Sequence, residues 1–345
     1  MTWRAIFGSL FRGRRDIASS FGSDWGALLA QLGLPTSAFD ELLAAGSLHP
    51  HFHYRHFTRP KRGGGHREIV EPDTKLKQVQ REILARYLVS EQPHVAAVAY
   101  RKKKSIADHV WAHVGAEVLV TADVQDFFPS TREERVLDWW HARAHDNLAR
   151  LLTLLTTYRG ELPQGAPTSP ALSNLLNHEL DERLTLRAEV AGARYTRYCD
   201  DMVFSWLQAA GPPSDFEIGV RAVLHEFGYC LHPEKGWRVH HRRDEPEITG
   251  VILTRHGRVR LPDDLRQTMR ELARSKDTGD LHRLAGFRGY ASMVTTKPRR
   301  FSPPRVSRSV PERAPTWGAA PPMTEPEFDD EFDEPSSDSE EEIPF

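Results

Sequence analysis

The chain has 345 residues, of which 39% are hydrophobic and 27% charged, and this length allows two or three packed subdomains. Two cysteines, Cys199 and Cys230, exclude a disulfide framework, and we expect a cytoplasmic protein because neither a signal peptide nor a membrane-spanning apolar run is visible. Residues 324–345 carry 11 acidic and no basic side chains, so the net charge of −2 conceals a body of net charge +9. Such a basic body favours a polyanionic partner.

The first 72 residues contain a predicted helical element and a basic hairpin. Helical spacing of apolar residues over 24–50 predicts a small N-terminal helical element within residues 1–50. Three glycines between basic residues then predict a hairpin with a mobile tip. Lys61, Arg62 and Arg67 lie at this tip, where they could close over phosphates; an ordinary basic turn is the alternative.

An acidic residue ends the next predicted strand. Residues 73–90 have the spacing of an amphipathic helix, and four basic residues follow at 101–104. The apolar run 118–122 predicts a buried strand that delivers Asp123 at its carboxyl end, where ligand sites gather. We interpret Asp126 as the N-cap of the following turn rather than as a metal ligand.

Residues 131–157 are predicted to be helical, and a tight loop containing Gln164 and Gly165 follows them. The next helix is expected to be capped by Ser169, with Pro170 at its first helical position. Its leucines lie on one face, which predicts that this helix packs beneath a sheet.

Two adjacent carboxylates, Asp200 and Asp201, interrupt an apolar and aromatic stretch at residues 194–206. We predict two short strands with the acidic pair at the tip of the hairpin. Adjacent carboxylates repel each other, and a hard divalent cation would remove that repulsion. A solvated turn is the alternative.

The last third of the chain is predicted to contain alternating helices and strands, followed by a segment of biased composition. The predicted elements are a helix at 216–227, a strand and turn at 228–235, a strand at 247–253 paired with 258–261, and helices over 262–294. Residues 298–345 are Pro- and Arg-rich and then acidic, which predicts a disordered linker and tail.

Asp123 and the Asp200–Asp201 pair can converge if their strands are neighbours in one sheet. Nucleotidyl transfer needs about three convergent carboxylates to hold two divalent ions, and we expect two Mg²⁺ ions, with Mn²⁺ as a substitute. The hairpin tip around Lys61 and Arg67 would hold a triphosphate, and the Gln164–Gly165 loop would line the base or sugar side.

The span from residue 55 to residue 290 resembles the bacterial, retron-type reverse transcriptases. The motifs that carry the resemblance are residues 60–67, Asp123 with Phe127 and Phe128, residues 164–174, 198–201, 231–235 and 248–250, in this order. The resemblance implies an α+β, right-hand polymerase fold with fingers, palm and thumb. Its implied parts are N-terminal helices at 1–50, fingers at 51–116, a palm with interleaved fingers segments at 117–253, a thumb at 254–297, and the disordered acidic tail at 298–345.

The resemblance also implies a reaction and its residues. It implies an RNA-directed DNA polymerase, in which a 3′-hydroxyl attacks the α-phosphate of a dNTP. The residues matching the catalytic and metal-binding positions are Asp123, Val124, Asp200 and Asp201. Those matching nucleotide contacts are Lys61, Arg62, Arg67, Phe128, Gln164 and Gly165, with Phe128 excluding a 2′-hydroxyl. Lys235 matches a general acid, and primer and template contacts are implied for Thr249, Gly250, Arg266, Arg270, Arg274 and Lys276.

The motifs that would identify the retron subgroup match less closely. Where retron enzymes carry Asn-Ala-x-x-His, residues 109–113 keep only the final His113, and Ile248-Thr249-Gly250 stands for Val-Thr-Gly. We expect a retron component that copies a cognate structured non-coding RNA into DNA in anti-phage defence, with an effector protein as a further partner and no membrane. The alternatives are another phage-defence reverse transcriptase with untemplated or protein-primed synthesis, and a non-catalytic RNA-binding scaffold. The acidic tail is either a solvating end or a mimic of nucleic acid that competes for the basic groove.

Overall fold

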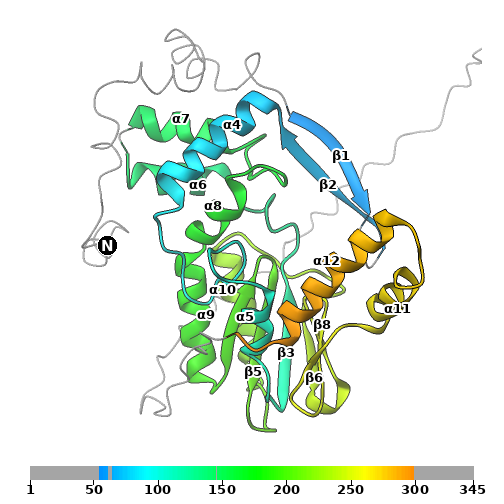
Figure 1. Cartoon of the computed structure of the whole chain (residues 1–345). Helices are drawn as coiled ribbons and strands as arrows, with labels where there is room; N and C mark the ends of the chain where they lie inside the picture. The colour runs from blue at the N-terminus through cyan, green and yellow to red at the C-terminus, as the bar shows by residue number, and fades with distance from the viewer. Residues whose placement is uncertain (1–53, 61–63, 145, 299–345) are drawn as a thin grey trace, which may run out of the picture. The chain divides into compact units, whose positions relative to one another are not determined.

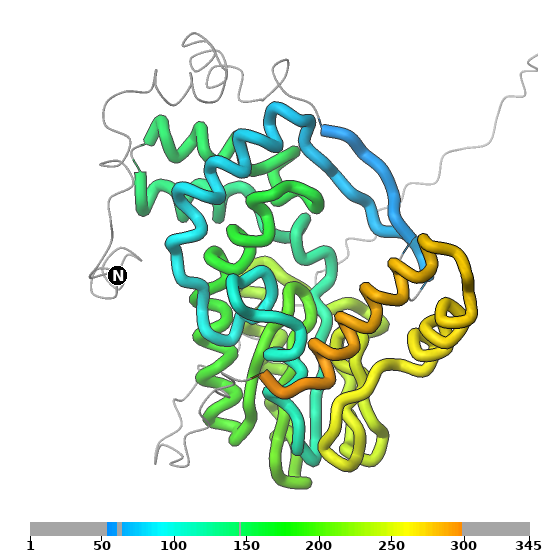
Figure 2. Tube along the Cα trace, viewed as in Figure 1, coloured from blue at the N-terminus to red at the C-terminus, as the bar shows by residue number. Residues whose placement is uncertain are grey.

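The computed structural model describes residues 54–60, 64–144 and 146–298. The predicted N-terminal element (1–50), Lys61, Arg62 and residues 299–345 of the predicted tail lie outside these described residues. The central feature is a four-stranded antiparallel sheet in the order β4-β5-β3-β6 (Figure 1). Its strands are β3 Val118–Asp123, β4 Arg194–Tyr198, β5 Asp201–Trp206 and β6 Arg238–His241. Their different colours in Figure 2 show that distant parts of the chain build this one sheet.

Strands β3 and β5 are buried on both faces of the sheet. On β3, Val120 and Ala122 pack into one hydrophobic core, whereas Leu119 packs into a second core. On β5, Phe204 belongs to the first core and Val203 to the second. Because successive side chains of a strand point to opposite faces, two-sided burial explains the continuous apolar runs in the sequence.

Helices build the first core together with the sheet. They are α4 Thr74–Ile83, α6 Glu133–His141, α7 Asp146–Thr156, α8 Ser169–Leu176, α9 His178–Val190 and α10 Phe216–Glu226. Helix α9 packs on β4, and α10 packs on α9. The ring of Phe216 on α10 lies edge-on to Phe204 and to Trp206, with centroids 5.2 Å from each. These contacts fix the helices against the sheet.

A smaller set of elements builds the second core. It consists of α5 Ile106–Trp111, the antiparallel sheet of β7 Glu247–Ile248, β8 Val251–Leu253 and β9 Val259–Arg260, and the helices α11 Asp263–Leu272 and α12 Thr278–Thr295. The short 3₁₀-helix η3 Arg242–Asp244 joins β6 to this sheet. The indole N–H of Trp111 donates to the carbonyl of Val294 at 3.0 Å, which ties the end of α12 to α5.

The outer edge of β4 is covered by an irregular segment. The N–H of Arg197 donates to the carbonyl of Ala96, and the N–H of Val98 donates to the carbonyl of Arg197, both at 2.8 Å. Ala97 thereby forms a parallel bridge with Arg197. On the opposite side of the described sheet, β6 is the outermost strand.

The predicted basic hairpin is confirmed as β1 Tyr54–Pro60 and β2 His66–Pro72. The N–H of Val70 on β2 donates to the carbonyl of Gln164 at 2.9 Å. Gly165 has a φ of +142°, and a Cβ atom there would lie 2.8 Å from the carbonyl oxygen of Val70. Glycine is therefore needed where the hairpin crosses this loop.

Several predicted helices are interrupted. The helix predicted over 73–90 ends as α4 at Ile83 and continues as the π-helix η2 Leu84–Leu88. The segments 131–157 and 262–294, predicted to be helical, each form two helices. The leucine-rich helix divides into α8 and α9 at Asn177, whose amide donates to the Ser173 carbonyl and the Tyr229 hydroxyl at 2.9 Å.

The predicted cap was wrong. Thr168 occupies the N-cap of α8, and Ser169 is the first helical residue. The hydroxyl of Ser169 donates to the carbonyl of Pro163 at 2.8 Å instead of capping the helix. Pro170 accordingly lies within the first turn but not at its first position.

Two predicted strands also differ from the structure. The strand predicted over 247–253 is a hairpin, because Thr249 and Gly250 have φ values of +47° and +80° and turn β8 back on β7. Its predicted pairing with the following strand is confirmed as β8 with β9. The strand predicted within 228–235 is reduced to one bridge, between Val124 and Leu231.

Within the described residues, no helix combines the length and apolar character needed to cross a bilayer.

We predict that Gly165→Ala lowers the free energy of unfolding by about 3 kcal/mol, because the new methyl group meets backbone and the φ value disfavours alanine. Gly228→Ala is the matched control: its φ is +78° but nothing lies within 4 Å of an added Cβ. The control should cost about 1 kcal/mol. Equal losses in urea unfolding would show that the contact with Val70 does not constrain residue 165.

Candidate active site

The predicted acidic hairpin is confirmed, with β4 and β5 joined by a turn at Cys199 and Asp200. We call residues 198–201 the acidic turn. Cys199 has a φ of +63°, a left-handed conformation that residues other than glycine rarely adopt. The Arg197 guanidinium donates to the carbonyl of Cys199 at 3.0 Å, and the N–H of Val124 donates to the carbonyl of Asp200 at 3.1 Å. The carbonyls of Cys199 and Asp200 are each fixed by a hydrogen bond from a residue outside the acidic turn.

The strand register brings the predicted carboxylates together. Asp123, the last residue of β3, is directly opposite Asp201, the first residue of β5. Directly opposed side chains project from the same face of a sheet, about 5 Å apart at Cβ. Asp200 precedes Asp201 in the turn, so three carboxylates gather at one end of the central sheet.

These carboxylates destabilise one another. Burial, and then the charges of Asp200 and Asp123, raise the pKa of Asp201 to about 7, whereas Thr249 and Arg67 act in the opposite direction. A nearby cation would favour the ionised form and offset this repulsion. The Arg67 effect also shows that the exposed arginine on β2 lies within electrostatic range of Asp201.

The donor set suits a hard cation, since oxygen ligands are what Mg²⁺ prefers. The side chains do not form a closed coordination site: among the described residues, no three His, Cys, Asp or Glu side chains are grouped to hold a metal ion. Val124 is buried and apolar, so only its carbonyl oxygen could serve as the predicted fourth ligand. The carboxylates that could hold an ion are those that gather at this end of the sheet, on Asp123, Asp200 and Asp201.

Two of the predicted nucleotide-pocket elements are Phe128 and the Gln164–Gly165 loop. Phe128 is buried, and its ring centroid is 6.4 Å from that of Tyr100. Phe127 is buried in the first core and stacks on Tyr229, with ring centroids 5.5 Å apart. The Gln164–Gly165 loop is held beneath β2 by the contacts with Val70.

Asp126 is exposed, with a φ of +45°, and its backbone carbonyl accepts from the N–H of Ser130 at 2.7 Å. It thus forms the turn through its main chain. A side-chain N-cap at Asp126 stays a prediction.

Two further predicted positions are near Asp123 and Asp201. The N–H of His232 donates to the carbonyl of Asp123 at 2.8 Å, and the exposed Lys235 follows in the same turn. Thr249 lies at the tip of the β7–β8 hairpin, close enough to Asp201 to lower the pKa of that carboxyl. Its hydroxyl is buried and makes no hydrogen bond of normal geometry within the described part of the chain.

The predicted primer and template residues on α11 and after it are exposed: Arg266, Arg270, Arg274 and Lys276. Arg266 is paired with Asp263 at 3.1 Å. These side chains lie on one short stretch of the chain outside the second core.

Sequence comparison decides the family. The family described as "Reverse transcriptase (RNA-dependent DNA polymerase)" matches residues 59–253, more than half of the chain. The chain belongs to the reverse transcriptase family. The matched span begins in β1 and ends with β8, so it contains the acidic turn, Asp123 and the hairpin at Thr249.

Curated relatives agree with this assignment. The retron Mx162 reverse transcriptase of Myxococcus xanthus is 31% identical over 307 residues, covering 78% of this chain and 63% of that protein. The retron Mx65 reverse transcriptase of the same organism is 34% identical over 311 residues, covering 78% and 71%. The retron Ec86 reverse transcriptase of Escherichia coli is 30% identical over 213 residues, covering 59% and 64%. The chain thus spans a little under two thirds of the Mx162 and Ec86 proteins, and the expected resemblance to bacterial retron-type reverse transcriptases is confirmed.

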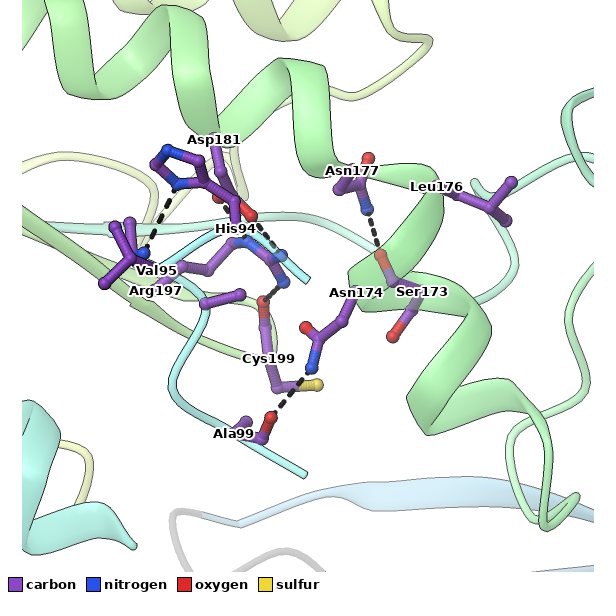
Figure 3. A network of polar contacts seen from close by, with 12 residues as sticks. His94, Val95, Ala99, Ser173, Asn174, Leu176, Asn177, Asp181, Arg197 and Cys199 are labelled. Atoms are coloured by element: carbon purple, nitrogen blue, oxygen red, sulfur yellow. Dashed lines mark hydrogen bonds and ion pairs between the residues drawn. The ribbon is translucent and has the colours of Figure 1, made fainter. Parts of the chain in front are cut away.

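In this member of the reverse transcriptase family, sequence reasoning missed a buried polar group that contacts the acidic turn. Arg197 and Asp181 are both 0% exposed and form a two-point ion pair, with nitrogen–oxygen distances of 2.8 and 2.6 Å (Figure 3). The available sequence signal was that Arg197 lies within a predicted strand, between the aromatic residues Tyr195 and Tyr198. Tyr100 was also missed; its hydroxyl donates to the sulfur of Cys199 at 3.2 Å.

The subgroup segment at residues 109–113 forms a second buried network. His113 contacts the hydroxyls of Ser205 and Thr196, both at 2.7 Å, and Thr196 also contacts His109 at 2.7 Å. Burial lowers the pKa of both histidines, so the network is neutral. His113, two residues after the end of α5, therefore links this segment to β4 and β5.

The raised pKa of Asp201 predicts a pH-dependent gain in stability for Asp201→Asn. Because the folded pKa of about 7 lies above the ordinary 3.8, ionisation costs stability increasingly as pH rises through this window. The cost has an upper bound of about 4 kcal/mol, which solvent screening reduces. With divalent ions removed, the variant should exceed the wild type in Tm more at pH 8 than at pH 5. Asp126→Asn is the control, and an equal difference at both pH values would contradict the prediction.

Proposed function

We propose that the protein is an RNA-directed DNA polymerase that joins dNTPs to a primer 3′-hydroxyl. The observation that carries the proposal is the register that sets Asp123 opposite Asp201, with Asp200 adjoining, inside the span that matches the family. The mutual destabilisation of these carboxylates supports a site that works with bound cations.

Asp123, Asp200 and Asp201, with the Val124 carbonyl, would hold two Mg²⁺ ions, for which Mn²⁺ could substitute. Bound there, the ions would favour ionisation of the attacking hydroxyl and neutralise charge on the transferring phosphate. Lys235 would donate a proton to the departing pyrophosphate. The chain's own contribution is to hold the carboxylates in one corner through the β3–β5 ladder.

The incoming dNTP would lie between the β1–β2 hairpin and the acidic turn. Arg67, within electrostatic range of Asp201, would contact the triphosphate together with Lys61 and Arg62. Gln164 and Gly165 would line the pocket, and the ring of Phe128 would exclude a 2′-hydroxyl. Thr249 and Gly250 would contact the primer end.

The elements support a division into fingers, palm and thumb. We assign residues 51–116 to the fingers, 117–253 to the palm with interleaved fingers segments, and 254–297 to the thumb. The exposed Arg266, Arg270, Arg274 and Lys276 would grip the duplex backbone.

We further propose that the template is a structured non-coding RNA, as the retron names of the relatives suggest, and that the protein works in the cytoplasm in anti-phage defence with an effector protein. Sequencing the nucleic acid that copurifies with the protein separates the alternatives. A defined RNA–DNA hybrid supports the retron assignment, whereas a homopolymer indicates untemplated synthesis.

Asp200→Asn combined with Asp201→Asn should leave RNA binding intact and reduce dNTP incorporation by roughly 10³-fold or more, because the ions lose two ligands. The matched control is the same double change at Asp329 and Asp330, an adjacent pair in the acidic tail. Primer extension on an RNA template measures both. Undiminished synthesis by the first variant would remove the polymerase assignment and favour an RNA-binding scaffold.

Phe128→Ala should raise rNTP incorporation relative to dNTP by about tenfold or more, because the ring no longer meets a 2′-hydroxyl. Phe127→Leu is the control, since Phe127 packs in the core beside Tyr229. Single-nucleotide incorporation with competing dNTP and rNTP gives the ratio. If both variants leave it unchanged, Phe128 is a core residue and discrimination lies elsewhere.

A further inference from the structure

The guanidinium of Arg197 donates three hydrogen bonds inside the protein. Its Nε and Nη2 atoms donate to the two carboxylate oxygens of Asp181 at 2.8 and 2.6 Å. Its Nη1 atom donates to the carbonyl of Cys199 at 3.0 Å, as Figure 3 shows. One planar group therefore joins helix α9 to Cys199, the residue of the acidic turn that directly precedes Asp200.

The turn needs such external support. Cys199 has a left-handed φ of +63° without being glycine, and conformations of this kind persist only where the surroundings over-determine them. The Arg197 contact fixes the carbonyl of Cys199, and the N–H of Val124 fixes that of Asp200. Without the first contact, the peptide ahead of Asp200 loses its hold on one side.

Asp181 and the backbone of Arg197 are themselves fixed by further contacts. Asp181 accepts a further hydrogen bond from the Tyr195 hydroxyl at 2.9 Å, and its helix neighbours Leu180 and Leu184 are buried in the first core. The backbone of Arg197 is bonded to Ala96 and Val98 on the covered edge of β4. The guanidinium also lies 5.4 Å from the ring centroid of Phe127.

We propose that Arg197, held by Asp181, is a positioning residue that sets the geometry of the acidic turn and hence of Asp200 and Asp201. This inference rests on the proposed polymerase function for its catalytic readout. Buried ion pairs are often replaceable by apolar residues without loss of stability, so we assign this pair a role in geometry rather than in folding energy.

The test replaces the polar cluster without leaving a buried charge. The triple variant Arg197→Met, Asp181→Leu, Tyr195→Phe removes the ion pair together with the Tyr195 hydroxyl that donates to Asp181, and leaves the Cys199 carbonyl without the Arg197 contact. Arg197→Lys keeps a positive charge opposite Asp181 but cannot form the planar three-way contact. Tyr195→Phe is the matched control, because it removes a hydrogen bond to the same carboxylate and leaves the contact with Cys199 in place.

We expect the triple variant and Arg197→Lys to keep a Tm close to that of the wild type and to lose about 100-fold in kcat for dNTP incorporation. The KM for dNTP should change by less than about threefold, because the nucleotide contacts are untouched. Mg²⁺ affinity, measured by calorimetry on protein without nucleotide, should weaken in both variants. Tyr195→Phe should retain the wild-type kcat and Mg²⁺ affinity.

A folded triple variant, or a folded Arg197→Lys variant, with wild-type kcat and Mg²⁺ affinity would overturn the proposal. If the triple variant does not fold, Arg197→Lys decides by the same readouts. Failure of the wild type itself to extend a primer would instead count against the proposed function. In that case the Mg²⁺ affinities of Arg197→Lys and Tyr195→Phe still test the positioning role.

Discussion

The pairing register of β3 and β5 is the constraint on which the site depends. A shift of one residue would turn every side chain of a strand to the opposite face. Asp123 and Asp201 would then no longer be opposed, and Val120 and Leu119 would exchange cores. Because both faces are buried, such a shift would disrupt packing on each side of the sheet. The two hydrophobic cores therefore determine where the carboxylates meet.

Unfavourable local conformations gather around this register. Cys199, Asp126 and Thr249 have positive φ values, although none of them is glycine. Thr249 is β-branched, which makes its left-handed backbone an outlier. Cys199 and Thr249 lie beside the paired ends of β3 and β5, and the exposed Asp126 follows β3 by three residues. The scaffold thus holds costly backbone geometry and mutually repelling charges at the same corner, as functional sites often do.

Much of this arrangement could be predicted from sequence, and the failures have physical reasons. The strand ending at Asp123 and the hairpin around Asp200 were predictable because apolar runs with an acidic end are local signals. The break at Asn177 was not, because the amide contacts the distant Tyr229. Arg197 was overlooked because a charged residue is expected at the surface, and only the fold shows that Asp181 meets it. The turn at Thr249 was hidden because a β-branched residue normally favours an extended strand.

The covered edge of β4 has a consequence for how the central sheet can grow. Segment 96–98 occupies the N–H and carbonyl groups of Arg197 on that edge, which hinders the addition of a strand there. Within the described residues, β6 is the other outermost strand, and its Val239 is 49% exposed. The neighbouring Arg238, His240 and His241 place basic or polar groups along it. Among the described strands, β6 is therefore the edge more open to strand addition, and the positive charge of Arg238 on it opposes pairing with a second copy of the chain.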